Sequence, residues 1–186
     1  MKINKIITII ALTLLVSTLS ANSFGKDITQ YLQQQGIPKP LIVLLISMLP
    51  IVELRGAIPV AIGLLGMSWW ESLFYAIIGN MLPIPLVLLF MNKLTILLNK
   101  WSFTRNLLTK IFARTRSKSK VIERYQEIGL TLFIAIPLPI TGAWTGSLAA
   151  HIFGLKFWKS LACALAGVSI AGIIMTLLSL GVFSFF

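Results

Sequence analysis

Residues 50–59 read Pro-Ile-Val-Glu-Leu-Arg-Gly-Ala-Ile-Pro and interrupt an apolar segment that covers residues 41–67. Each flank is too short to cross a bilayer, because a helix rises about 1.5 Å per residue and the hydrocarbon core is about 30 Å thick. Two half-helices that meet at a polar tip form a re-entrant hairpin, whose irregular backbone must be buried in protein or line a wet cavity. The stretch predicts such a hairpin. A spanning helix is predicted over residues 72–98, with a kink at Pro83 and Pro85.

The same plan recurs later in the chain, where residues 137–146 read Pro-Leu-Pro-Ile-Thr-Gly-Ala-Trp-Thr-Gly. They interrupt the apolar segment 128–154, and a second spanning helix is predicted over residues 157–182. A shift of 88 residues aligns identical residues in the two halves, and matched glycine, tryptophan and serine positions are hard to obtain from apolar bias alone. The aligned pairs are Gly66 and Gly154, Trp70 and Trp158, Ser72 and Ser160, Leu73 and Leu161, Ala76 and Ala164, and Gly79 and Gly167. We interpret the two halves as a repeat.

The two copies are predicted to have opposite orientations in the membrane. Each half would cross once while its hairpin returns to the side it left, so the second copy must be inverted, as in many secondary transporters. Lysine and arginine mark the cytoplasmic side, and in this topology all but Lys26, Lys39 and Arg55 of the 16 lie there. The predicted fold is an all-α, multi-pass protein of the inner (plasma) membrane. Its two inverted repeats each hold a re-entrant hairpin and one transmembrane helix.

The remaining segments follow from charge and hydropathy. Residues 1–25 have lysines before a short apolar run and a small polar stretch, which indicates a signal peptide or, alternatively, an N-terminal anchor helix. Residues 26–40 form an interfacial segment, expected to be a short helix ended by Gly36 and Pro38. The predicted parts that follow are repeat 1 over residues 41–99, a basic cytoplasmic loop over 100–127 and repeat 2 over 128–186.

The composition excludes several classes of protein. Hydrophobic residues make up 57% of the chain and the mean hydropathy is +0.92, which is too apolar for a soluble domain. The net charge of +11 comes from basic residues between apolar segments, not from a folded basic module, so no nucleic-acid partner is predicted. One cysteine, Cys163, and one histidine, His151, argue against a disulfide or a metal cluster. We predict no enzyme, no cofactor and no metal.

The first tip carries the charges Glu53 and Arg55, the only ones in the apolar segment 41–67. An ionisable residue at membrane depth costs about 2.5–3.5 kcal/mol, so this pair needs an explanation. One interpretation is a mutually neutralising pair that holds the tip together. The functional interpretation is that Arg55 receives an anionic group while Glu53 takes up and releases a proton. Residues two apart face opposite sides of a helix, so an unwound tip is expected to let them converge.

The second tip is uncharged and offers Thr141, Trp144 and Thr145. We interpret it either as a packing motif of small residues or as a neutral half-site whose backbone amides and carbonyls face the charged tip. Asn80 in the first spanning helix is expected to hydrogen-bond a tip or a neighbouring helix. Prolines and glycines are expected to shape both tips. These residues are Pro50, Gly56, Pro59, Pro137, Pro139, Gly142 and Gly146.

At these tips the sequence resembles the small multidrug export protein family. The family pattern of Glu-Leu-Arg-Gly-Ala-Ile-Pro and Pro-Leu-Pro-x-Thr-Gly-Ala-Trp-Thr-Gly matches residues 53–59 and 137–146, within a resemblance that covers roughly residues 40–180. That family is thought to be related to the DedA and VTT membrane proteins. The resemblance implies two facing re-entrant hairpins, proton coupling and, in several members, movement of lipids or polyprenyl phosphates. Glu53 and Arg55 then resemble the acidic and basic membrane residues that are important in DedA proteins.

We therefore expect a small, proton-coupled transporter that exports or flips an amphipathic small molecule or lipid by alternating access. A hydrophobic cation would bind Glu53, whereas a polyprenyl phosphate or anionic lipid would bind Arg55 with Glu53 as its proton partner. The alternative from another class is a non-transporting membrane scaffold protein in which the charged tip is structural. The expected partners are membrane lipids and the transported molecule, and a homodimer fits so small a bundle.

Overall fold

The computed structural model describes residues 25–98, 119–137 and 141–183, and this part of the chain is helical, without strands. A first helix covers residues 25–34 and is followed by Gly36, whose φ of 73° favours glycine, as expected for the interfacial segment. The other helices are α2 (Lys39–Met48), α3 (Glu53–Gly63), α4 (Trp69–Met81), α5 (Ile84–Leu98), α7 (Ser119–Ala135), α8 (Ala143–Ile152) and α9 (Phe157–Phe183). The predicted signal peptide or anchor lies outside the described residues, apart from Gly25.

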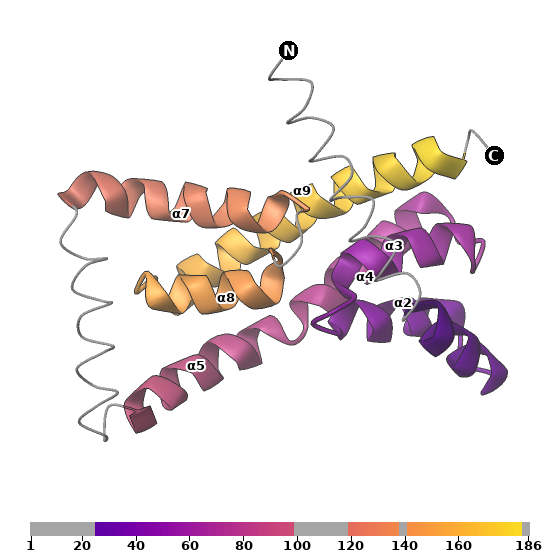
Figure 1. Cartoon of the computed structure of the whole chain (residues 1–186), viewed down its shortest axis with the longest axis horizontal. Coiled ribbons are helices and arrows are strands. Elements are labelled where there is room, and N and C mark those ends of the chain that lie inside the picture. The colour runs from indigo at the N-terminus through magenta and orange to yellow at the C-terminus, as the bar shows by residue number, and fades with distance from the viewer. Residues whose placement is uncertain (1–24, 99–118, 138–140, 184–186) are drawn as a thin grey trace, which may run out of the picture.

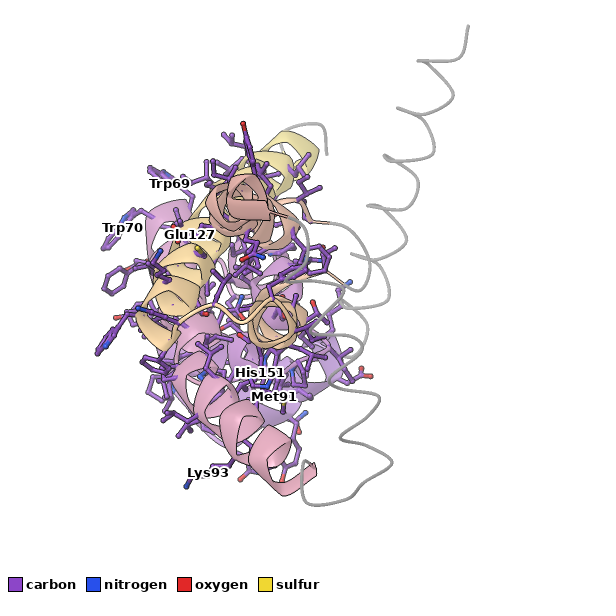
Figure 2. All side chains as sticks on the ribbon, turned by 90° about the vertical axis from the view of Figure 1, so that its left-hand side faces the viewer. Trp69, Trp70, Met91, Lys93, Glu127 and His151 are labelled. Carbon is purple, nitrogen blue, oxygen red and sulfur yellow. The ribbon has the colours of Figure 1, made fainter. Side chains whose placement is uncertain are left out.

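Two helical stretches are long and apolar enough to cross a membrane. They are Trp69–Met91, which joins α4 to the first part of α5, and Phe157–Gly181 in α9. Large apolar side chains are exposed along both, and Figure 2 shows Trp69 and Trp70 projecting outward, each more than half exposed. Such a concentration of exposed apolar surface is typical of contact with lipid. The prediction of an all-α protein with two membrane-length helices is confirmed.

The first of these stretches is broken at Leu82 and Pro83, between α4 and α5. Pro83 has no N–H to donate to the carbonyl of Gly79, so the helical hydrogen bonds are interrupted there. They resume where the N–H of Val87 donates to the carbonyl of Pro83 at 2.9 Å. The predicted kink is present, and beyond it α5 packs against α8.

Each membrane-length stretch packs through a glycine on a helix from its own half of the chain. α4 contacts α2, and a Cβ on Gly79 would overlap the carbonyl group of Leu44. α9 contacts α7, and a Cβ on Gly167 would come too close to the carbonyl of Thr131 and the side chain of Ile134. Because a glycine has no side chain, the helix backbones can approach this closely.

The helix after the first tip begins earlier than the sequence predicted. α3 starts at Glu53, so Arg55 and Gly56 are helical and the prediction of an unwound segment as far as Pro59 was wrong. Pro59 lies inside α3, where it removes one backbone donor without ending the helix. Away from water, each backbone N–H and C=O needs a partner, and a helix provides these partners where an unwound segment does not.

In the second half, too, the helix after the tip begins earlier than the sequence predicted. α7 ends at Ala135 and α8 starts at Ala143, so Ala143 to Gly146 of the predicted interruption are helical. Residues 119–127 of the predicted basic loop are helical and continue into the apolar part of α7. Glu127, at that junction, accepts a hydrogen bond from Lys159 of α9 at 2.5 Å, so α7 and α9 are also joined near the start of α9.

α9 connects the two halves of the molecule. It contacts α3 and α4 on one side of the sequence and α7 and α8 on the other. Figure 1 shows α2, α3 and α4 gathered toward one end of the molecule and α7 and α8 toward the other, with α9 extending past both groups. The starts of α3 and α8 meet between these groups, and the candidate site is built there.

Candidate functional site

The carboxyl group of Glu53 lies at the N-terminus of α8. The backbone N–H of Trp144 donates to Glu53 Oε1 at 3.4 Å, and the N–H of Ala143 also donates to this carboxyl. The first N–H groups of any helix lack partners within it and carry a partial positive charge, which attracts an anion. Glu53 therefore acts as a cap for α8, although the two are some ninety residues apart in sequence. Its side chain is buried, with only 6% of the residue exposed.

Gly142, the N-cap residue of α8, makes this approach possible. Its φ of 150° and ψ of −173° belong to a region that essentially only glycine occupies. A Cβ built on Gly142 would overlap both carboxylate oxygens of Glu53. The absence of a side chain is thus required both by the backbone conformation and by the contact between the tips.

Glu53 itself has an uncommon backbone conformation. It is the first residue of α3 and the only described non-glycine residue with a positive φ, 47°. This left-handed conformation costs about 1–2 kcal/mol for a residue with a Cβ. The N–H of Glu53 donates to the carbonyl of Leu49 at 2.9 Å, which closes the turn that joins α2 to α3. Strain of this kind is found where a side chain must be held in a particular place.

Arg55 makes a second contact between the tips. Its Nη2 donates to the hydroxyl of Thr141 at 2.9 Å, and that hydroxyl donates to the carbonyl of Ile136 at 2.8 Å. The Arg55 guanidinium is therefore connected through Thr141 to the end of α7. The charges of Glu53 and Arg55 also attract each other.

A narrow pocket separates these groups from α4 and α9. The side chains that line it leave no room for a water molecule. The lining residues are Glu53, Leu54, Arg55, Asn80, Ile134, Gly142, Ala143, Val168 and Ala171. Asn80 thus lies beside the tips, but the hydrogen bond expected from it to a tip or to a neighbouring helix is absent among the described residues.

Asn80 is fully buried, and neither its amide oxygen nor its amide nitrogen has a hydrogen-bond partner in the part of the chain that the structure describes. A buried polar group without a partner costs about 1–3 kcal/mol, so such a group in a pocket calls for an explanation. Together with Glu53 and Arg55, it forms a polar cluster in otherwise apolar surroundings.

The other candidate residues of the second tip have more local contacts. Trp144 contributes its backbone N–H to Glu53, while its indole Nε1 is buried without a partner among the described residues. The hydroxyl of Thr145 donates to the carbonyl of Gly142 at 3.4 Å, within the first turn of α8. Thr145 therefore belongs to the helix start and makes no described contact with the charged tip.

The residues expected to shape the first tip take different positions. Pro50 is exposed in the turn between α2 and α3, whereas Gly56 is buried within α3. Pro59 is half-buried on the same helix. Only Pro50 lies in the irregular backbone for which all three were proposed.

At the second tip, Pro137 is buried just after α7, and Pro139 lies outside the described residues. Gly146 faces α7, because a Cβ on it would overlap the side chain of Ile134. Gly146 thus allows close helix packing, and Gly142 is the glycine that contacts the charged group.

Sequence reasoning expected backbone amides of the second tip to face the charged tip, but it did not identify which amides bind or which group they bind. The N–H groups of Ala143 and Trp144 bind Glu53, and no side-chain pattern reveals them, although Gly142 before a helical segment is a signal for a helix start. No group of three or more His, Cys, Asp or Glu side chains that could hold a metal ion is present within residues 25–98, 119–137 and 141–183. The site is formed by one carboxyl, one guanidinium, one amide and the N-terminus of a helix.

Comparison of the sequence with known proteins identifies a family for this chain. No curated protein and no solved structure matches it. One family does match, over residues 53–174, and this range includes Glu53, Arg55, Asn80 and the whole second tip. The match covers more than half of the chain and agrees with the resemblance found at the tips. The chain therefore belongs to the family described as "Putative small multi-drug export protein".

Proposed function

We propose that this protein is a small membrane transporter in which α2–α3 and α7–α8 are re-entrant hairpins of two inverted repeats. The observation that carries the proposal is the burial of Glu53 against the N-terminus of α8. A charged group held between two broken helices is the arrangement used by many transporters for substrate or coupling ion. Membership of an export family supports the same conclusion.

Equivalent local geometry in the two halves supports the repeat. Ser72 and Ser160, which are 88 residues apart, each donate a side-chain hydrogen bond to the carbonyl four residues earlier, at 2.8 and 3.1 Å. Gly66 and Gly154, also 88 residues apart, have positive φ angles of 62° and 73° and precede α4 and α9. Together with the glycine contacts of α4 and α9, these features repeat the same helix–turn–helix plan.

The described state is best interpreted as closed. The pocket between the tips has no room for a water molecule, and two hydrogen bonds, from Trp144 to Glu53 and from Arg55 to Thr141, join the tips. Movement of a substrate past this point requires that the two bonds break. Alternating access then consists of opening the contact first toward one side of the membrane and then toward the other.

Glu53 is suited to couple this opening to protons. As a carboxylate it is attracted by the partial positive charge at the start of α8 and by Arg55. Protonation removes both attractions and leaves a neutral carboxyl that can still form hydrogen bonds. A proton taken up by Glu53 therefore weakens the contact between the tips, which is the property that a coupling residue needs.

The substrate proposed first is an amphipathic small molecule, in keeping with the family. The second candidate is a polyprenyl phosphate or another anionic lipid, as in the DedA proteins that the tips resemble. Arg55 and the N–H groups of α8 favour the second candidate, because both bind anions. The proposed location is the inner membrane, with lipids as surroundings and a homodimer as the assembly.

The test is proton-driven transport in proteoliposomes. Wild type, Glu53→Gln and Arg55→Gln would be compared, with a polyprenyl phosphate and a hydrophobic cation as parallel substrates. Glu127→Gln is the matched control, because it removes a half-exposed carboxylate that lies outside the site. Each variant must elute as a folded protein of unchanged size before its transport is interpreted.

Transport that is lost in Glu53→Gln and kept in Glu127→Gln is the expected result. Loss of phosphate movement in both tip variants would favour the lipid phosphate, whereas cation movement lost only without Glu53 would favour drug export. Unchanged transport in folded Glu53→Gln protein would contradict the proposal. Absence of any transport by wild type would favour the scaffold protein, in which the charged tip is structural.

A further inference from the structure

We infer that the pocket between the tips is a binding site for an anionic group, a phosphate or carboxylate, and that the Glu53 side chain occupies it as an internal substitute when no substrate is bound. This inference deepens the proposed function, on which it rests, by naming the charged group that a transported molecule carries. It assigns Asn80 and the first N–H groups of α8 to that site.

The first argument is the surroundings of the Glu53 carboxyl. It accepts hydrogen bonds from the N–H groups of Ala143 and Trp144 and interacts with the charge of Arg55. A helix N-terminus together with a guanidinium is a combination that binds phosphate and carboxylate groups in many proteins. Glu53 has the charge, the oxygen atoms and the position that such a ligand would have.

The second argument is independent and comes from Asn80. This side chain lines the same pocket, is fully buried, and has both amide atoms without a hydrogen-bond partner in the described chain. An amide nitrogen kept without a partner at this depth costs stability, and an anion in the pocket would accept its hydrogen bond. Glu53 is hydrogen-bonded at α8 and accepts no hydrogen bond from Asn80, so the donor on α4 remains unused in the closed state.

The third argument concerns how the internal carboxylate can leave. Its bond to Trp144 is long, at 3.4 Å, and the backbone of Glu53 is held at a strained φ of 47°. Both features make the closed contact easier to break than a relaxed, short hydrogen bond. An entering anion can therefore replace Glu53 at α8, and the displaced carboxyl can take up a proton so that the exchange leaves the net charge of the pocket unchanged.

The test is an affinity measurement, which does not depend on transport. Binding of radiolabelled inorganic phosphate to purified protein in detergent would be measured by equilibrium dialysis. In parallel, the protein would be placed in nanodiscs of phosphatidylcholine that contain a minor fraction of phosphatidic acid. Native mass spectrometry would then count the phosphatidic acid molecules that stay bound to the protein when it is released from the nanodisc. The first experiment detects a free anion, and the second detects the same group on a lipid.

The variants test separately the Glu53 carboxylate, which competes with the bound anion, and the side chains that would bind that anion. Glu53→Gln keeps the size of the side chain and removes the competing charge, so we expect at least one probe to bind about tenfold more tightly than it binds to wild type. Adding Arg55→Gln or Asn80→Asp to this variant is expected to abolish the gain. Glu127→Gln, the matched control, is expected to bind as wild type does. If Glu53→Gln fails to fold, Asn80→Asp alone is still expected to lower the binding seen in wild type.

Each outcome bears on the inference. A gain with phosphate alone indicates a small soluble anion, and a gain with phosphatidic acid alone indicates a lipid headgroup. Equal or weaker binding of both probes by folded Glu53→Gln would overturn the inference, as would a gain that persists after Arg55→Gln and Asn80→Asp. If the protein shows the predicted binding pattern but transports nothing, the proposed function is refuted and the anion site is supported. If it transports a cation but lacks this binding pattern, the anion site is refuted and the proposed function is supported.

Discussion

The α2–α3 tip and the α7–α8 tip have related positions in the sequence and opposite chemistry. The α2–α3 tip supplies a carboxyl, a guanidinium and a strained residue, Glu53. The α7–α8 tip supplies a glycine, a hydroxyl and the N–H groups of a helix start. Each tip provides what the other lacks, because the carboxyl binds the helix start and the guanidinium binds the hydroxyl.

The two halves share some features and differ in others. The glycines that bring α4 and α9 close to their neighbours occupy equivalent positions, since both serve helix packing. The tips differ, and two identical charged tips would place like charges against each other. The predictions below test this division between shared packing and complementary tips, from the largest expected effect to the smallest.

The largest effect is expected for Gly142→Ala, which would break the contact between the tips. The new Cβ meets the Glu53 carboxyl, and the backbone conformation disfavours any residue with a Cβ, so the free energy of unfolding should fall by about 3 kcal/mol. Chemical unfolding in mixed micelles measures it. Gly129→Ala is the control, because a Cβ there meets nothing and alanine favours a helix by about 0.5–1 kcal/mol. Equal effects of the two substitutions would contradict the geometry of the tips.

Next in size are Gly79→Ala and Gly167→Ala, which test the shared packing. Each alanine would push its helix away from a neighbouring backbone carbonyl, at a cost of about 1–3 kcal/mol in the free energy of unfolding. Gly79 should show the larger loss, because its neighbours are closer. The same unfolding assay applies, and a loss at only one of the two positions would break the equivalence of the halves.

The contact of Arg55 with Thr141 is expected to be worth about 1.5 kcal/mol, as for a hydrogen bond to a charged group. A double-mutant cycle with Arg55→Gln and Thr141→Val measures this coupling through the unfolding free energies of the single and double variants. Thr145→Val serves as the comparison, because among the described residues the Thr145 hydroxyl donates to the carbonyl of Gly142, within the start of α8, and should not couple to Arg55. If Arg55 coupled as strongly to Thr145 as to Thr141, the coupling could not be assigned to the contact between the tips.

Asn80→Leu is expected to stabilise the fold by about 1 kcal/mol while it weakens anion binding. The substitution removes a buried amide without a described partner and keeps the branched shape and the number of non-hydrogen atoms of the side chain. Thermal unfolding in detergent and the phosphate-binding assay would be measured on the same samples. A clear loss of stability would show that the amide is a structural donor or acceptor, which would weaken its assignment to the anion site.

The smallest effect is expected for the exposed pair of Lys159 and Glu127. Both side chains are more than a third exposed, and such pairs contribute about 0.2–1 kcal/mol. Glu127→Gln should lower the unfolding free energy by no more than this, and added salt should reduce the difference. An effect as large as that of the Arg55 and Thr141 cycle would mean that this contact between α7 and α9 is much stronger than its exposure suggests.

Much of the architecture could be predicted because prolines, glycines and charges interrupt apolar segments at characteristic places. The two membrane-length helices, the break at Pro83 and Gly36 after the first helix all follow from local chemistry. The extent of the tips could not be predicted in the same way. Pro59 suggested unwound backbone, yet α3 continues through it, because the helix pairs backbone groups that an open segment would leave without partners.

By itself, the sequence determined that Glu53 and Arg55 are unusual, since charges in an apolar segment need partners. It also determined that the second tip is neutral and rich in small residues. Only the tertiary structure decided that those partners are the start of α8 and the hydroxyl of Thr141, and that Asn80 lines the same pocket. The physical reason is that backbone N–H groups exist at every residue and become an anion site only where a helix begins, and the packing of α3 against that beginning depends on the whole bundle.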